Sequence, residues 1–194
     1  METAPDDAHW AAYNADQGDR PARPLCREVL ELAGVGSGRT AVDLGCGAGR
    51  ETIALLDAGW RVHAIDGILP AFADVDRERL TVEAAHFAEL TVLPTADLVY
   101  AGYSLPYQPP DQFHRLWKLI RASLQPGGWI AANIFGERDA WAGAAGMTFL
   151  RSAEVRGLFD GMEIVRWSET DEEGPAYSGP KHWHVFDVVA RLPA

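Results

Sequence analysis

Residues 43–49 read Asp43-Leu44-Gly45-Cys46-Gly47-Ala48-Gly49, and this is the most informative stretch of the chain. It ends a short apolar run, Thr40–Leu44, and precedes an amphipathic helical pattern, Arg50–Ala58. An acidic residue lies near the end of the predicted strand, and glycine at every second position lets the backbone turn sharply into the helix. Because glycine has no side chain, a ligand can approach the main chain closely here. The stretch is typical of a loop that binds a nucleotide-type cofactor, although a tight turn without a ligand would use the same residues.

The spacing of the glycines separates two classes of cofactor. The dinucleotide fingerprint G-x-G-x-x-G needs a third glycine at position 50, which is Arg50 in this chain. The pattern D-x-G-x-G-x-G instead resembles the first motif of class I S-adenosylmethionine-dependent methyltransferases. In that family the aspartate faces the methionine part of the cofactor, and the glycine loop passes beneath the ribose and methionine. The resemblance therefore implies that S-adenosylmethionine is the cofactor, bound by Asp43, Gly45, Cys46, Gly47 and Gly49.

Strand and helix patterns alternate along most of the chain. Strands are predicted at residues 40–44, 60–65, 80–84, 98–101, 129–135, 162–167 and 183–191, and helices at 25–32, 50–58, 69–76, 111–124 and 149–159. A turn is expected at 125–128, a looser segment at 137–147 and an acidic loop at 169–179. Parallel strands need crossover helices, so this order predicts an α/β fold with helices on both faces of a mostly parallel sheet. The last two strands have no helix between them and can pair antiparallel. A seven-stranded, Rossmann-like sheet with an antiparallel last strand is the fold of the family named above.

Length, charge and cysteine content narrow the function. The 194 residues predict a single domain at residues 25–194, preceded by an N-terminal lid or tail at residues 1–24. A net charge of -11 and scattered basic residues argue against a nucleic acid or a membrane as partner. Two cysteines make a disulfide framework unexpected, and neither a signal peptide nor a membrane span is apparent. We expect a cytoplasmic protein that is a monomer or a homodimer.

Asp66 is the second predicted anchor for the cofactor. It lies at the tip of the second predicted strand, about 20 positions past the glycine loop, where a carboxylate can accept hydrogen bonds from both ribose hydroxyls. The alternative is a solvated turn formed by Asp66 and Gly67. Gly67 is also assigned to cofactor binding, and Ile68 is expected to pack on the adenine face. After the third strand the family usually has an aspartate that bonds the adenine amino group, whereas this chain has His86, followed by Phe87.

His86 and Phe87 each have a predicted role at the adenine. A neutral imidazole can accept a hydrogen bond from the amino group, and the amide of Phe87 can donate to the ring. An exposed loop position is the alternative for His86.

The loop after the fourth predicted strand, residues 100–107, lies where ligands of open α/β sheets bind. We assign Ala101 to the cofactor and Tyr107 to catalysis, with simple packing as the alternative for the tyrosines. The end of this loop partly resembles the D/N/S-P-P-Y motif of amino-directed DNA methyltransferases, but Leu105 replaces the first proline.

The N-terminal segment contains further candidate binding residues. Trp10 and Tyr13 resemble the aromatic lid of several small-molecule methyltransferases, and Tyr13 is assigned to cofactor binding. Arg20 is a candidate to hold the carboxylate of the cofactor or of an acidic acceptor. A disordered acidic tail is the alternative for this segment.

Two histidines open the last predicted strand. His182 and His184 are expected on one face of it, at the cofactor side of the sheet. His184 is a candidate general base, with a structural role as the alternative. A metal site needs a further ligand that the sequence does not reveal, so no metal is predicted.

These features predict transfer of a methyl group from S-adenosylmethionine to a small-molecule acceptor, similar to the tellurite-resistance and thiopurine methyltransferases. Two other functions stay open. One is a non-catalytic module that binds S-adenosylmethionine or S-adenosylhomocysteine, with residues 169–179 as its contact surface. The other is a methyltransferase for a protein or nucleic acid.

Overall fold

The computed structural model describes residues 3–72 and 75–194. Its helices are α1 (Asp7–Asp16), α2 (Pro24–Ala33), α3 (Arg50–Asp57), the 3-10 helix η1 (Leu105–Tyr107), α4 (Pro110–Ser123) and α5 (Ser152–Leu158). Its strands are β1 (Thr40–Leu44), β2 (Arg61–Asp66), β3 (Leu80–Ala84), β4 (Ala96–Ala101), β5 (Leu124–Phe135), β6 (Glu163–Gly174) and β7 (Lys181–Arg191).

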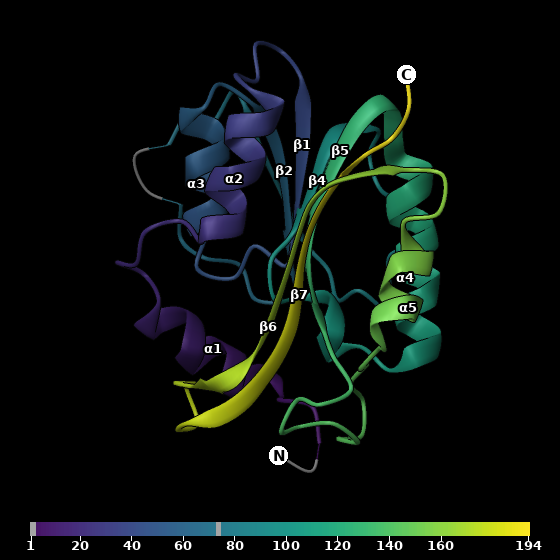
Figure 1. Cartoon of the computed structure of the whole chain (residues 1–194). Helices are drawn as coiled ribbons and strands as arrows, with labels where there is room; N and C mark the ends of the chain where they lie inside the picture. The colour runs from purple at the N-terminus through teal and green to yellow at the C-terminus, as the bar shows by residue number, and fades with distance from the viewer. Residues whose placement is uncertain (1–2, 73–74) are drawn as a thin grey trace.

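The strands form one seven-stranded sheet in the order β3-β2-β1-β4-β5-β7-β6. Strands β1 to β5 pair in parallel, and β7 runs antiparallel to both β5 and β6. Helices α2 and α3 cover one face, and α4 and α5 cover the other (Figure 1). The predicted fold class, a Rossmann-like sheet with an antiparallel last strand, is confirmed.

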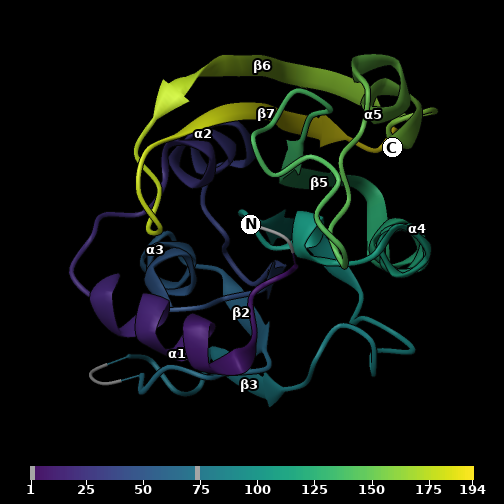
Figure 2. The same cartoon turned by 90° about the horizontal axis from the view of Figure 1, so that it is seen from below.

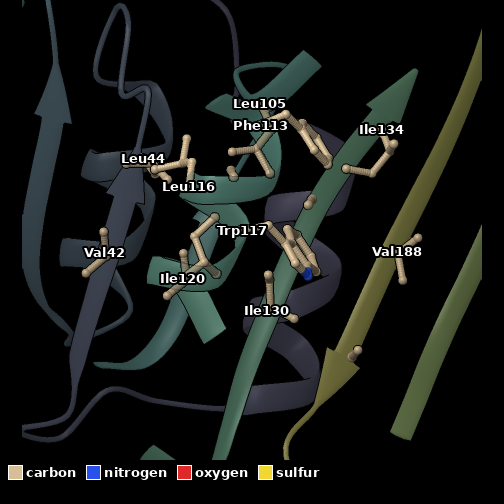
Figure 3. Close-up of a cluster of buried hydrophobic side chains, with 14 of the residues drawn as sticks. Val42, Leu44, Leu105, Phe113, Leu116, Trp117, Ile120, Ile130, Ile134 and Val188 are labelled. Atoms are coloured by element: carbon tan, nitrogen blue, oxygen red, sulfur yellow. The ribbon is translucent and has the colours of Figure 1, made fainter. Parts of the chain in front are cut away.

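The alternation of apolar side chains explains why helices cover both faces. On one face Phe113, Leu116, Trp117 and Ile120 form the apolar stripe of α4 and pack against the sheet, which contributes Val42, Leu44, Ile130, Ile134 and Val188 (Figure 3). On the other face a second core joins residues of α2 and α3, such as Val29 and Leu55, to the same strands. It also contains the fully buried Trp60, which lies between α3 and β2. Such two-sided burial is what a central parallel sheet requires.

Two sequence predictions about local structure are wrong. The described residues of the segment 69–76, namely 69–72 and 75–76, contain no helix, and residues 73 and 74 lie outside the described part of the chain. Phe72 is buried against Cys46 and Ala64, and this contact holds the segment under the glycine loop without a helical turn. Residues 169–174, most of which are acidic, belong to β6 instead of a loop, because each pairs with a residue of β7, for example Asp171 with His184.

Two further segments are more ordered than their composition suggests. Residues 125–128 lie within β5, where the pairing with β4 shifts and Gly127 has a φ of 75°. Residues 137–147 form turns whose Ala144 and Met147 pack in a small core with Phe135 and Val185. Burial of these small apolar side chains fixes a segment that has no regular secondary structure.

The N-terminal helix α1 and the turn between β6 and β7 approach the same edge of the sheet (Figure 2). Seen from below, α1 and the turn between β6 and β7 flank the edge at which β1 and β2 end (Figure 2). None of the described helices is long and apolar enough to cross a membrane. This edge is where the sequence places the ligand.

Candidate functional site

A cavity of about 740 Å³ opens at the carboxyl ends of β1, β2 and β4. Its walls come from the glycine loop, the ends of β2 and β3, the loop after β4, helix α1 and the β6–β7 turn. This volume lies within the usual range of small-molecule sites, and the position is the one that open α/β sheets use for ligands.

Most of the residues predicted for the site line this cavity. Those that do are Tyr13, Arg20, Gly45, Cys46, Gly47, Asp66, Gly67, Ile68, His86, Phe87 and Tyr107. Four do not, namely Asp43, Gly49, Ala101 and His184. Gly102, the neighbour of Ala101, lines it instead.

The glycine loop requires its glycines for two different reasons. Gly45, Gly47 and Gly49 all have positive φ angles, of 84°, 48° and 77°. A Cβ atom on Gly45 would lie 2.4 Å from the Cβ of Ser104. A Cβ on Gly49 would lie 2.6 Å from the ring of Phe72, which is outside the cavity. Gly45 therefore allows the loop after β4 to approach the glycine loop, and Gly49 allows the ring of Phe72 to pack beneath the glycine loop.

Asp43 holds the loop from below. Its side chain is buried and accepts a hydrogen bond from Oγ1 of Thr52 in α3, at 2.5 Å. Burial raises the pKa of Asp43 to about 7, and the nearby carboxylate of Glu51 adds to this shift. Since Asp43 does not line the cavity, the structure places it as a link between β1 and α3 and not as a ligand contact.

Asp66 occupies the position that a ribose-binding carboxylate needs. Its Oδ2 accepts from the amide of Gly47 at 2.9 Å, and its Oδ1 accepts from the amide of Ile68 at 2.9 Å. Burial raises its pKa, opposed by these two hydrogen bonds. Each oxygen uses one lone pair in this way and keeps further acceptor capacity. The carboxylate is thus fixed by the main chain while it faces the cavity.

His86 and Phe87 follow β3 at the edge of the cavity. The imidazole of His86 packs over Gly67, where an added Cβ would lie 2.6 Å from Nδ1. Its Nε2 lies 3.8 Å from a carboxylate oxygen of Asp7 in α1, and its side chain is 55% exposed. The ring therefore borders both the turn after β2 and the N-terminal helix.

Helix α1 covers the cavity through aromatic contacts. The ring centroids of Trp10 and Tyr107 are 4.7 Å apart, and those of Tyr13 and Tyr177 are 5.5 Å apart. Arg23 at the start of α2 donates from Nη2 to the hydroxyl of Tyr13 at 2.8 Å. These contacts join α1 to the loop after β4, to the β6–β7 turn and to α2.

Arg20 is held by Glu51, a residue that the sequence did not single out. Two nitrogens of Arg20 donate to the two carboxylate oxygens of Glu51, at 2.6 and 2.8 Å, and the amide of Arg23 donates to Glu51 at 2.9 Å. Burial opposes the ionisation of Glu51, but the bonds from Arg20 outweigh it and hold the pKa of Glu51 below its usual value. One feature of the sequence could have pointed to Glu51, because it is an acidic residue in the first turn of the helix that follows the glycine loop.

The tyrosines after β4 are hydrogen-bond donors at neutral pH. Burial raises the pKa of Tyr103 to about 12 and also raises the pKa of Tyr107. The Tyr107 ring lies between Trp10 and Phe135, with centroid distances of 4.7 and 5.5 Å. A protonated phenol cannot act as a general base, so the catalytic assignment of Tyr107 is restricted to donating a hydrogen bond or shaping the cavity.

The structure places His184 away from the cavity, which corrects its assignment as a general base. Its side chain is buried, and Nδ1 accepts from the amide of Arg138 at 3.0 Å. Its Nε2 lies 3.0 Å from Glu169, and Arg138 pairs with both Glu169 and Asp171 at 2.8 Å. Although ligand atoms of Glu169, Asp171 and His184 lie within 4.8 Å of one another, the guanidinium already supplies the positive charge there.

Comparison with known proteins identifies the domain. Residues 41–128 match the model of the family described as "Methyltransferase domain". Over 47% of the chain, the sequence is 37% identical to the cypemycin N-terminal methyltransferase of a Streptomyces species, of which the match covers 40%. Over 63% of the chain it is 30% identical to the trans-aconitate 2-methyltransferase of Rhodococcus jostii, of which the match covers 48%. The chain thus spans less than half the length of these curated relatives.

A solved structure agrees in fold. The 1,6-didemethyltoxoflavin-N1-methyltransferase of Burkholderia thailandensis, solved with bound 1,6-didemethyltoxoflavin and S-adenosylhomocysteine, superposes with a TM-score of 0.72. The two sequences are 21% identical, and the superposition covers 96% of this chain and 87% of the other. The strand order and this superposition show the fold of class I S-adenosylmethionine-dependent methyltransferases, and residues 41–128 match the methyltransferase domain family.

Proposed function

We propose that this chain binds S-adenosylmethionine and transfers its methyl group to a small-molecule acceptor. The observation that carries the proposal is the carboxylate of Asp66, which is held by the amides of Gly47 and Ile68 and lines the cavity. Its remaining lone pairs suit two neighbouring hydroxyl groups, such as those of a ribose. The named activities of the relatives agree with a methyltransferase.

The residues around the cavity fit the rest of the cofactor. Cys46 and Gly47 offer a floor with small side chains, and His86 and Phe87 border the space beyond Ile68. Arg20 lines the cavity, and its Nε is buried without a hydrogen-bond partner among the described residues. A buried donor of this kind suits the carboxylate of an amino acid.

The chemistry requires little from the protein beyond placement. S-adenosylmethionine supplies an electrophilic methyl group on a sulfonium. The residues of the chain must therefore hold donor and acceptor in line and exclude water. Trp10 and Tyr107 contribute by closing the cavity, while Tyr103 and Tyr107 stay protonated. We infer that residues 1–24 act as a lid and residues 25–194 as the methyltransferase domain.

The alternatives fit the cavity less well. A non-catalytic binding module would not need the aromatic side chains that continue the cavity past the glycine loop, such as Tyr103 and Trp183. A protein or nucleic acid acceptor would need an open entrance, whereas α1 and Tyr177 approach each other over this one. A net charge of -11 further disfavours nucleic acid. A cytoplasmic location and a monomer or homodimer remain part of the proposal.

Calorimetry with S-adenosylmethionine and S-adenosylhomocysteine tests the proposal. We expect both ligands to bind the unmodified chain, and Asp66→Ala to weaken binding tenfold or more, because each hydrogen bond to a charged group contributes about 1.5–3 kcal/mol. The control is Asp76→Ala, an acidic residue that pairs with Arg79 and does not line the cavity. Equal affinity of Asp66→Ala and the unmodified chain would remove Asp66 from the site. Transfer of labelled methyl to a panel of carboxylates, amines, thiols and phenols then tests the activity.

A further inference from the structure

The cavity has two chemically different ends. Near the glycine loop it is lined by main chain and by Asp66, whereas the other end is lined by Trp10, Tyr103, Tyr107 and Trp183, here called the aromatic end. The ring centroids of Trp10 and Tyr107 are 4.7 Å apart, and those of Tyr103 and Trp183 are 6.0 Å apart. Rings that form the walls of a cavity favour a ligand with a flat, unsaturated body.

Arg23 contributes a positive charge at the aromatic end. Its guanidinium carbon lies 4.9 Å from the centroid of the Tyr103 ring, and its Nη2 donates to the hydroxyl of Tyr13. The side chain of Arg23 forms no ion pair with any residue in the described part of the chain, and Glu51 accepts only from its amide. The carboxylate of Glu51 is close enough to interact with this charge, but both of its oxygens are paired with Arg20. Since a half-buried charge is costly without a counter-ion of its own, Arg23 indicates an anionic ligand.

Arg20 and Arg23 differ in the ligand group that each can bind. Arg20 is neutralised by Glu51, next to the glycine loop, and retains one buried donor. Arg23 contacts Tyr13 and Tyr103 and keeps most of its donors. The first arrangement suits the amino-acid end of the cofactor, and the second suits the anion of a separate molecule.

We propose that the methyl acceptor is a planar, unsaturated carboxylate whose carboxylate group is bound by Arg23 at the aromatic end of the cavity. The inference rests on the proposed function, because the acceptor must lie beside the cofactor. A guanidinium binds a carboxylate through two parallel hydrogen bonds, and the rings around it contact the flat body of the ligand. Arg23 then determines which acceptors are chosen.

A set of three indoles tests this inference in the full chain saturated with S-adenosylhomocysteine. Indole-3-acetate carries a carboxylate, indole-3-acetamide is its neutral counterpart, and tryptamine is cationic. Calorimetry should give a dissociation constant for the carboxylate about tenfold or more below that of the amide, with tryptamine weakest. Arg23→Met should remove this preference and keep the affinity for S-adenosylhomocysteine within about twofold, and Arg23→Lys should keep part of it. Arg27→Met is the control, since Arg27 lies on the same helix and donates to the carbonyl of Ala22.

Several outcomes would overturn the inference. Equal or tighter binding of the amide or tryptamine would exclude a carboxylate acceptor, and so would the absence of binding by all three at millimolar concentration. A tenfold loss of S-adenosylhomocysteine affinity in Arg23→Met would assign Arg23 to the cofactor instead. Failure of the unmodified chain to bind S-adenosylhomocysteine at all would refute the proposed function, and this inference with it. Thermal unfolding of each variant confirms that it is folded.

Discussion

The ion pair between Arg20 and Glu51 should stabilise the whole molecule, and Glu51→Gln tests this. The side chains of Arg20 and Glu51 are 21% and 6% exposed, so the pair is largely removed from water. The glutamine keeps the size of the side chain but leaves the guanidinium without its counter-ion. Breaking a buried pair from one side costs about 3–5 kcal/mol, and the partial exposure of Arg20 places the expected loss near the lower value.

A loss of about 3 kcal/mol corresponds to a fall of roughly 6–12 °C in the melting temperature of a domain of this size. Thermal and urea unfolding followed by circular dichroism measure it. The matched control is Glu137→Gln, because Glu137 pairs with Arg151 at the surface, where both side chains are about half exposed or more, at 46% and 74%. An exposed pair contributes at most about 1 kcal/mol. The reasoning fails if the two variants lose the same stability, or if Arg20→Met and Glu51→Gln are additive in a double-mutant cycle.

Two further predictions concern the glycine loop and the residue beneath it. Because the folded chain raises the pKa of Asp43 from an ordinary 3.8 to about 7, its contribution to stability is present at low pH and is lost as the pH rises towards and through 7. Asp43→Asn should therefore flatten the decline of the unfolding free energy between pH 4 and pH 8, and parallel curves for the two proteins would contradict this. Gly45→Ala should weaken S-adenosylhomocysteine binding about tenfold or more by calorimetry, because φ is 84° and the new Cβ would lie 2.4 Å from Ser104. Gly157→Ala in α5, where an added Cβ meets nothing within 4 Å, should leave binding unchanged; similar losses in both variants would refute the steric argument.

The fold was accessible from the sequence because its signals are local. The glycine loop, the apolar runs and the stripe of α4 each lie within a few residues, and the order of the elements then determines the pairing of strands. Asp66 was found for the same reason, since one helix separates it from the loop. The predicted helix at residues 69–76 failed because Phe72 is held by a tertiary contact with Cys46 and Ala64.

The site depends more on contacts between distant residues. Glu51 pairs with Arg20, which is 31 residues away in the sequence. Arg138 contacts Glu169 and His184, which are 31 and 46 residues away. No local sequence pattern identifies such partners. The sequence therefore predicts His184 as a general base, although both of its ring nitrogens have partners in the structure. The full length of β6 could not be predicted from the sequence either. Charged residues are typical both of loops and of edge strands that must resist pairing with another chain.

The cover of the cavity joins two segments from opposite parts of the chain. Tyr177 in the β6–β7 turn contacts His9 and Tyr13 of α1, with centroid distances of 5.6 and 5.5 Å. During synthesis on the ribosome, Gly45 and Asp66 emerge more than 100 residues before Tyr177, so the nascent chain carries an uncovered cofactor site until that turn has been made. The pocket acquires its ceiling only when the β6–β7 hairpin has been made, which ties exclusion of water to the synthesis of that hairpin.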